Sequence, residues 1–327
     1  ENFSRPEPYT TALGQLGVEV LYGNYYQANW QEWLQENAGY FDYIYMQRPH
    51  ISIKFIDVLK EYSRAKIFYF AHDLHHLRIM RDYEVTGRLE AKEEAEKWRN
   101  IEYELFEKAD VGHVVGSFEQ QIIQRAFPDK AIRNIPLYIY EDKPERIEKD
   151  FSKRHDILFV GGFGHKPNVD AVLWFADKVF PEVLRSYPDL TWHIVGGDAP
   201  SEVKALAGDQ IHLEGFLTDQ ELEQMYRRCR MVIVPLRYGA GVKGKIVEAA
   251  YYQIPVVTTS IGGEGLDAEI GFFEMEDEAE KLSELIINLY EAFGKLKIMS
   301  DAGEELIRRY FTVEAAKRVL CLDMNII

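Results

Sequence analysis

The stretch that decides the fold is Met231–Leu266, which reads MVIVPLRYGAGVKGKIVEAAYYQIPVVTTSIGGEGL. It begins with a short apolar run of the kind that fills a strand buried on both faces. A glycine-rich turn follows at 237–244, and Lys245–Tyr252 then shows the apolar spacing of a helix. Pro255 precedes a second apolar run at 256–259. The order of strand, loop, helix and strand predicts a parallel α/β unit whose loop binds a ligand at the carboxyl end of the first strand.

The loop between the first strand and the helix has the chemistry of an anion site. Glycines let the backbone approach an anion closely, and a helix N-terminus offers unpaired N–H groups with a partial positive charge. Lys243 and Lys245 add full charges, and Glu248, further into the helix, can accept two hydroxyl groups such as those of a ribose. We therefore expect a diphosphate here. A glycine-rich turn with solvated lysines and a surface Glu is the alternative.

The stretch resembles the donor-site segment of retaining glycosyltransferases with the GT-B fold, glycosyltransferase family 4 (glycosyl transferases group 1) in particular. In that family a Glu-x7-Glu motif spans this loop and helix. Glu248 matches the second Glu, which holds the nucleotide ribose, whereas Ala240 stands at the position of the first. A subset of the family has a glycine-rich loop there instead. The resemblance implies that Gly239, Ala240, Gly241 and Val242 bind the sugar-nucleotide donor together with Glu248.

A second glycine-rich loop lies in Phe159–Asp170, after an apolar run and before a helix pattern, so it is another candidate phosphate contact. Gly162 and Gly164 lack the third glycine of a dinucleotide fingerprint, which disfavours a dehydrogenase. The resemblance implies an Arg and a Lys here against the distal phosphate. Lys166 matches the Lys, while Gly162 or Phe163 stands near the position of the Arg. A lysine that merely flanks a turn is the alternative.

The run Ala71–His76 ends an apolar segment of the first half and is rich in histidine. The resemblance implies that His72 reaches the transferred sugar, with Asp73 and His75 as further candidates. Histidines this close together also suggest a metal, but the local spacing does not supply a full set of ligands. Hydrogen-bonded packing is another alternative, and we predict no metal.

Two further loops are expected to line the site. The segment 211–222 resembles the family segment whose backbone at Phe216 and Leu217 faces the nucleobase. Gly262–Gly265 closes the loop after the last buried strand of the quoted stretch and can also line the cleft. Ordinary connecting loops are the alternative for both.

Composition narrows the class of protein. The chain has 327 residues, 46% of them hydrophobic, which is enough for two domains with real cores. A net charge of −16 disfavours nucleic acid or an anionic membrane surface as the main partner. The cysteines, Cys229 and Cys321, lack ligand-like spacing and suit a reducing compartment. No apolar run reaches transmembrane length, so we expect a cytoplasmic protein.

Apolar and amphipathic segments alternate along both halves, which predicts parallel-sheet α/β units. Strands are expected at Val18–Tyr22, 41–46, 66–71, 111–115, 132–135, 156–161, 191–195, 210–213, 231–236, 256–259 and about 271–274. Helices are expected near 28–37, 51–62, 86–107 and 117–126, the charged run in the third being a solvated face. Ser117 and Thr218 have capping-box spacing, and Asn168 is expected to be a helix cap.

The polar stretch between Tyr138 and His155 contains Pro144 and is predicted to link two domains. Two Rossmann-like domains facing a central cleft is the GT-B arrangement. We expect an acceptor-side domain at 1–150, a nucleotide-sugar donor domain at 151–308, and a C-terminal helix in 309–327 that crosses back onto the first domain. The chain begins without Met and without a leading strand. We therefore expect a fragment that binds donor and needs upstream residues for efficient transfer.

The resemblance implies a metal-independent, retaining hexosyltransferase that moves a sugar from a nucleoside diphosphate to a glycan or lipid-linked acceptor, in surface polysaccharide or glycoconjugate synthesis. No cofactor is expected besides the donor substrate. Lys166, Lys243 and Lys245 are the expected catalytic residues, with His72 positioning the sugar. Two alternatives stay open: a non-catalytic sugar-nucleotide-binding module of a longer chain with other domains, and a GT-B sugar-nucleotide epimerase.

Overall fold

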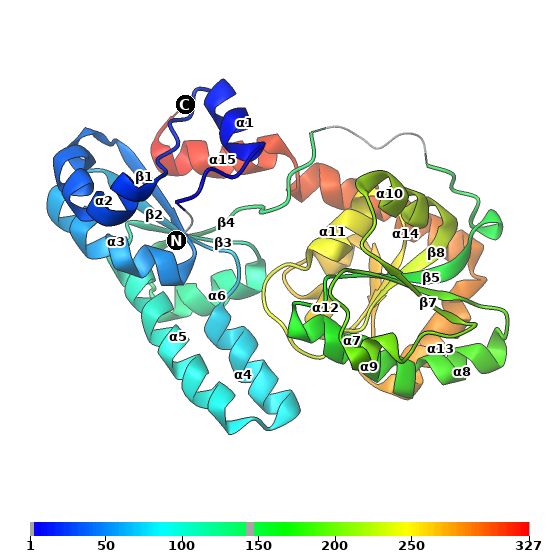
Figure 1. Ribbon diagram of the computed structural model, residues 1–327. Coiled ribbons are helices and arrows are strands. Elements are labelled where there is room, and N and C mark those ends of the chain that lie inside the picture. Colours follow the sequence, from blue (N-terminus) through cyan, green and yellow to red (C-terminus); the bar gives the residue numbers. More distant parts are fainter. Residues whose placement is uncertain (1–2, 142–146, 327) are drawn as a thin grey trace.

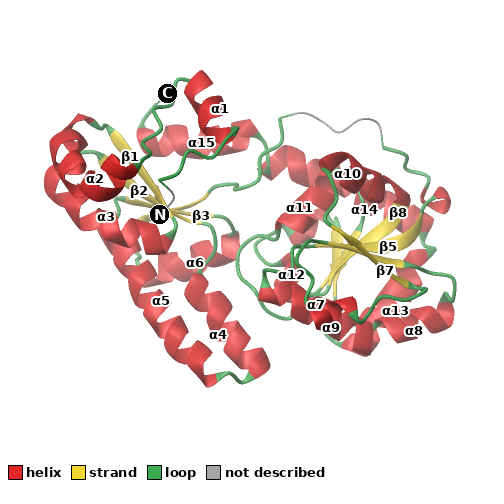
Figure 2. Cartoon of the chain, viewed as in Figure 1, coloured by secondary structure: helices red, strands yellow, loops and turns green. Residues whose placement is uncertain are grey.

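The computed structural model describes residues 3–141 and 147–326 and shows two α/β domains, each built on a parallel sheet (Figure 1). Helices flank both sheets (Figure 2). The fold class predicted from the alternation of apolar segments is thus confirmed. Across the described residues, no helix combines the length and apolar character that crossing a membrane requires.

The first domain has the strand order β1-β2-β3-β4, and each neighbouring pair is parallel. Its strands are β1 (Tyr43–Gln47), β2 (Lys66–Ala71), β3 (Val111–Val114) and β4 (Ala131–Asn134). Its helices are α1 (Tyr9–Gln15), α2 (Asn24–Asn37), α3 (Pro49–Tyr62), α4 (His75–Thr86), α5 (Leu89–Lys108) and α6 (Ser117–Ala126). Helix α4 was not predicted, because histidines and charged residues interrupt its apolar positions.

The second domain has the strand order β10-β9-β8-β5-β6-β7, again with parallel neighbours. Its strands are β5 (His155–Val160), β6 (Trp192–Val195), β7 (Ile211–Gly215), β8 (Cys229–Val234), β9 (Val256–Thr258) and β10 (Phe273–Met275). Its helices are α7 (Lys166–Lys178), α8 (Phe180–Ser186), α9 (Ser201–Lys204), α10 (Asp219–Arg228), α11 (Gly244–Tyr251), α12 (Ser260–Gly263), α13 (Ala279–Tyr290) and α14 (Phe293–Tyr310).

The order of these strands fixes where a ligand can bind. The chain runs outward from β5 to β6 and β7, then returns to the other side of β5 to form β8. The direction of winding therefore reverses between β5 and β8, and loops at such a point diverge to leave a crevice at the carboxyl ends of the strands. All residues of β8 are buried, as its apolar sequence predicts.

The C-terminal helix α15 (Val313–Met324) packs against the first domain, in agreement with the prediction that it crosses back (Figure 1). Its contact centres on Asp323, which is buried. Asp323 Oδ2 lies 3.0 Å from Nε2 of His113 on β3, and its Oδ1 accepts a hydrogen bond from Nε of Arg133 on β4 at 3.2 Å. Tyr43 Oη donates to the carbonyl of Met324.

The strand predicted at Val18–Tyr22 is wrong. The segment lies between Gly17 and Gly23, which both have positive φ, and it pairs with no strand among the described residues. Leu21 lines an apolar groove with Trp33 and other side chains of α2 and α3. Leu21 is partly buried against these helices, whereas Val18 and Tyr22 are exposed, so the alternation does not report a strand of the sheet.

The helix caps were predicted with mixed success. Thr218 forms the predicted capping box with Glu221 at the start of α10. Ser117 is the first residue of α6 and makes no capping bond, and the N-cap of α7 is His165 rather than Asn168. The predicted linker falls partly outside the described residues, Pro144 included.

We predict that Asp323→Ala destabilises the first domain, because it leaves Arg133 and His113 without their buried partner. Leaving a buried hydrogen-bonding group, here the ring of His113, without its partner costs about 1–3 kcal/mol. Calorimetric unfolding should show a lower melting temperature for Asp323→Ala. Glu314→Ala, which removes an exposed carboxylate from the same helix, serves as control. Equal melting temperatures for the two variants would contradict an anchoring role for Asp323.

Candidate functional site

The loops that follow β5 and β8 meet at the point where the winding reverses. A Cβ atom at Gly161, directly after β5, would lie 2.6 Å from Nζ of Lys245 and 2.7 Å from Nδ2 of Asn168. Both distances are shorter than real Cβ contacts, so only glycine leaves room for the lysine here. The two predicted glycine loops are therefore parts of one site.

Lys245 is held by side chains from strand β5 and helix α7. Its Nζ donates a hydrogen bond of 2.6 Å to Oδ1 of Asn168 and lies 4.2 Å from the centre of the Phe159 ring. The amide of Asn168 in turn donates to the carbonyl of Gly162 at 2.7 Å. Desolvation, with a smaller contribution from Lys243, lowers the pKa of Lys245 to about 7. Asn168, expected to be a cap, thus positions the lysine.

Lys243 is 8% exposed and braces the glycine turn that carries it. Its Nζ donates to the carbonyl of Gly241. Desolvation lowers the pKa of Lys243 to about 8, although the carboxylates of Glu264 and Glu119 oppose this shift. A bound anion would therefore stabilise the charged form of each lysine.

Lys166 occupies the first residue of α7 and is exposed, unlike the other two lysines. Gly162 and Gly164 are exposed as well, and a Cβ built at either would meet nothing within 4 Å. The loop thus faces open space next to the N-terminus of α7. His165, which sequence reasoning missed, is the N-cap residue of this helix, although its side chain makes no capping bond. Desolvation, followed by Arg78 and Lys245, lowers its pKa to about 4, so the ring is neutral at pH 7.

Glu248 lies on α11 with Tyr226 of α10 beside it. Tyr226 Oη donates to Oε2 of Glu248 at 2.9 Å, and Tyr226 itself is fully buried. Burial raises the pKa of Glu248, and the bond from Tyr226 opposes that rise. The bond from Tyr226 therefore orients the carboxylate of Glu248.

Phe216 and Leu217 follow β7 and lie at the same edge of the sheet. The Phe216 ring is 84% exposed, whereas Leu217 packs against the core of the domain. The Cβ of Phe216 is 3.9 Å from a Cβ built at Gly197, which follows β6. An exposed aromatic ring at the carboxyl ends of these strands suits a planar base.

The first domain brings His72 to the glycine turn. A Cβ built at Gly241 would lie 3.1 Å from the carbonyl oxygen of His72 and 3.2 Å from Cβ of Asp73. The ring nitrogen Nε2 of His72 lies 3.0 Å from Oε1 of Gln47, the last residue of β1. Desolvation, followed by Arg48, lowers the pKa of His72, which keeps the imidazole neutral. The turn at 239–242 thus lies between the domains.

Two polar links from the first domain hold this turn, and neither was predicted. Arg81 of α4 donates to both carboxylate oxygens of Glu264 at 2.8 and 2.6 Å, and also to the carbonyl of Gly239 at 2.7 Å. Glu119 of α6 is 1% exposed and accepts a hydrogen bond from the backbone N–H of Gly241. Burial raises the pKa of Glu119. Its other oxygen, Oε2, has no hydrogen-bond partner within the described ranges.

The remaining histidines of the predicted cluster serve packing. Glu102, fully buried on α5, accepts hydrogen bonds from the backbone N–H groups of His75 and His76 at 2.6 and 3.3 Å. Nδ1 of His75 and Nδ1 of His76 lie 3.2 and 2.5 Å from the same carboxylate. Desolvation opposes ionisation of Glu102, but these bonds outweigh it and lower its pKa. The carboxylate therefore caps the start of α4.

Comparison with known proteins agrees with this geometry. Residues 154–292 match the family model described as Glycosyl transferases group 1. An uncharacterized 44.6 kDa protein in the cps region of Klebsiella pneumoniae is 32% identical over 144 residues. The alignment covers 42% of this chain and 37% of that protein, so it spans well under half of the relative's length.

Solved structures share the fold at low sequence identity. HepE from Anabaena in complex with UDP has a TM-score of 0.70 and 16% identity, over 97% of this chain and 89% of that one. For sucrose-phosphate synthase from Thermosynechococcus elongatus the TM-score is 0.67 and the identity 16%, over 94% and 80% of the two chains. For TarM from S. aureus, in complex with UDP, fondaparinux and alpha-GlcNAc-glycerol, the TM-score is 0.64 and the identity 16%. The match covers 89% of this chain and 57% of that one. The chain therefore has the fold of the GT-B glycosyltransferases, and its second domain carries the match to glycosyl transferases group 1.

Proposed function

We propose that this chain is a retaining glycosyltransferase that moves a sugar from a nucleoside diphosphate sugar to a glycan or lipid-linked acceptor, without a metal ion. The observation that carries the proposal is the pair of desolvated lysines, Lys243 and Lys245, on glycine loops at the reversal point of the second sheet. Such a pair favours an anionic ligand with more than one charge. The family match and the neighbours solved with UDP support a sugar nucleotide as that ligand.

The proposed donor spans the crevice from the base to the sugar. Phe216 and Leu217 contact the base, and Glu248 accepts the ribose hydroxyls. The N-terminus of α7 with Gly162, Gly164 and Lys166 faces the distal phosphate. The turn Gly239, Ala240, Gly241 and Val242 borders the sugar, opposite His72 of the first domain.

The proposed chemistry is electrostatic. As the bond between the sugar C1 and the phosphate oxygen breaks, negative charge grows on the diphosphate, and Lys243, Lys245 and Lys166 stabilise it. The acceptor oxygen bonds to C1 on the same face, and its proton passes to the departing phosphate. The neutral ring of His72 then positions the sugar rather than carrying a charge.

The relative in the cps region supports a role in surface polysaccharide or glycoconjugate synthesis. A cytoplasmic location stays a prediction. One observation favours a second candidate, a sugar-nucleotide-binding module without turnover. Ala240 supplies no carboxylate to the turn, and no arginine occupies the loop 161–165.

We expect UDP to raise the melting temperature of the chain in EDTA, and Glu248→Ala to weaken UDP binding by about 1.5–3 kcal/mol, the range for hydrogen bonds to charged groups. Isothermal titration calorimetry measures the second effect. Glu284→Ala, which removes an exposed carboxylate from α13 of the same domain, is the control. Unchanged affinity in Glu248→Ala, or binding that requires magnesium or manganese, would show that the donor assignment is wrong.

Turnover of UDP-sugars, measured as released UDP, separates the two candidate functions. Replacing Lys243 or Lys245 by Met should lower kcat by about 10²–10³, as the loss of other groups that stabilise transition-state charge does. Lys166→Met tests the exposed lysine of α7, with Lys178→Met at the other end of the helix as control. Wild-type binding of UDP without any turnover, in the presence of acceptors, supports the non-catalytic module.

The affinity for UDP should fall as pH rises from 7 to 8.5. Both lysines lose their proton in this window in the free protein, since their pKa values are about 7 and 8, whereas bound diphosphate favours the charged forms. Binding should therefore take up protons, and the affinity should drop about tenfold or more over the window. Titration calorimetry in buffers of different ionisation enthalpy measures the uptake. In Lys245→Met the pH dependence should be weaker, and an equal slope in both proteins would contradict the assignment.

A further inference from the structure

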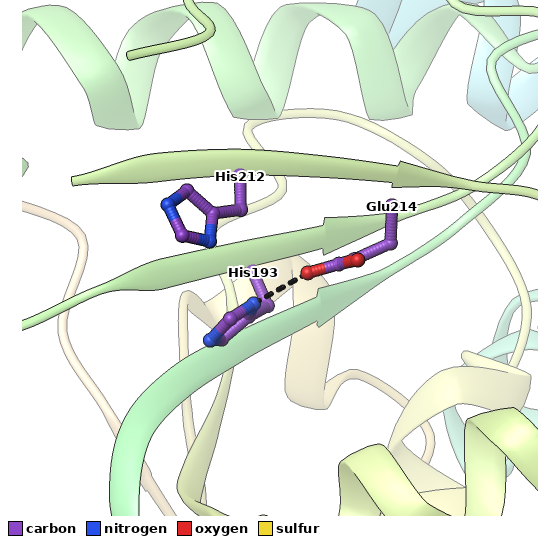
Figure 3. Close-up of side chains that lie close together, drawn as sticks. All are labelled: His193, His212 and Glu214. Atoms are coloured by element: carbon purple, nitrogen blue, oxygen red, sulfur yellow. Dashed lines mark hydrogen bonds and ion pairs between the residues drawn. The ribbon is translucent and has the colours of Figure 1, made fainter. Parts of the chain in front are cut away.

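A group of metal-binding side chains lies on the outer strands of the second sheet, apart from the lysines of the donor site (Figure 3). His193 on β6 and His212 on β7 are register partners, and their ring centres are 5.4 Å apart. Glu214 lies two residues beyond His212 and so points to the same face of the sheet. One donor atom from each of the three side chains lies within 4.8 Å of the other two.

Two imidazoles and one carboxylate form a donor set suited to Zn²⁺ and other first-row divalent ions. Bonds of about 2.0–2.1 Å to one ion require donor atoms roughly 3–3.5 Å apart. The atoms Nδ1 of His193 and Oε1 of Glu214 are 2.7 Å apart, so this pair must open slightly to admit an ion. His212, exposed on the edge strand, must turn toward the pair and give up the contact of its Nε2 with the carbonyl of Asp209 at 3.2 Å.

The surroundings of His193 supply the outer partner that a ligating histidine needs. The ring is 3% exposed, and its Nε2 lies 3.4 Å from Oδ2 of Asp156 on β5. If Nδ1 binds an ion, Nε2 carries the hydrogen and can donate it to Asp156, which fixes the ring. Such carboxylate–histidine–metal arrangements are common in metal sites.

Arg228, the last residue of α10, is the one cation that contacts His193 in the described structure. Its Nη2 lies 2.7 Å from Nε2 and 3.3 Å from Nδ1 of the ring. Two carboxylates, Asp156 and Glu214, face this single guanidinium. When His193 is neutral, these side chains together therefore carry one net negative charge. Arg228 is also an electrostatic neighbour of Asp156, which can hold the guanidinium once it leaves the ring.

We propose that His193, His212 and Glu214 bind a divalent transition-metal ion, Zn²⁺ in particular, in a structural site. The ion ties the edge strand β7 to β6 directly before Gly215, where the loop with Phe216 begins. The site makes no contact with the lysines proposed to stabilise the diphosphate. Sugar transfer itself is still expected to proceed without a metal.

The test is titration of the metal-free chain with ZnCl₂, followed by calorimetry, and with CoCl₂, followed by visible absorption. The wild-type chain should bind one equivalent and give the d–d bands of cobalt held by nitrogen and oxygen ligands. His212→Ala should lose about 100-fold or more in Zn²⁺ affinity, and Glu214→Gln about tenfold. Arg228→Gln should bind Zn²⁺ more tightly, because a competing cation is removed. His155→Ala, which removes an exposed histidine from β5 of the same sheet, should bind as the wild type does.

Zn²⁺ should also raise the melting temperature of the wild-type chain but not that of His212→Ala. Since His212 is exposed, this variant should fold, and UDP binding in EDTA verifies that it does. Equal Zn²⁺ affinity in wild type and His212→Ala, or no stoichiometric binding by the wild type, would overturn the proposal. Loss of UDP binding with intact Zn²⁺ binding would instead contradict the donor site alone, so the two proposals fail separately.

Discussion

The candidate site is built around two lysines whose pKa values are lowered by burial, and at Lys243 the carboxylates of Glu264 and Glu119 offset only part of that shift. Lys245 has a neutral amide and an aromatic face as neighbours, and Lys243 has a backbone carbonyl beside it. Desolvating a charge in this way is unfavourable and is compensated by the rest of the fold. The buried strands β5 and β8 provide that compensation, because their apolar packing places the two glycine loops side by side. The multiply charged anion proposed as the ligand would favour the charged forms of both lysines.

The first domain completes this site instead of merely facing it. Arg81 and Glu119 bind the backbone of the turn on either side of Ala240, one at Gly239 and the other at Gly241. A buried ion pair such as Arg81 with Glu264 adds little net stability but favours one geometry over others. The shape of the turn comes from the neighbouring domain, through main-chain contacts that do not depend on the side chain at 240.

The elements that depend on a local pattern of residues were predicted from the sequence. The residues whose role depends on contacts with distant parts of the chain were not. The apolar runs located β2 and β8, and the glycine spacing located both loops of the site. Asn168, Arg81 and Glu119 could not be recognised, because each acts through a partner at least 77 positions away. Val18–Tyr22 has the alternation of a strand, but Val18 and Tyr22 are exposed and Leu21 lies against helices instead of a sheet. An apolar alternation therefore does not by itself establish that a segment pairs with a sheet.

The two groups of histidines likewise show that residues adjacent in sequence need not form a site, whereas residues distant in sequence can. His75 and His76 are adjacent in sequence, yet a helix start fixes them, since their backbone N–H groups need an acceptor and Glu102 supplies it. His193 and His212 are separated in sequence, and strand register alone makes them neighbours. Adjacent residues on a helix or strand diverge, whereas register partners on parallel strands converge on one face. Clusters of ligand-type residues along the chain are thus weaker evidence for a metal than pairs brought together by a sheet.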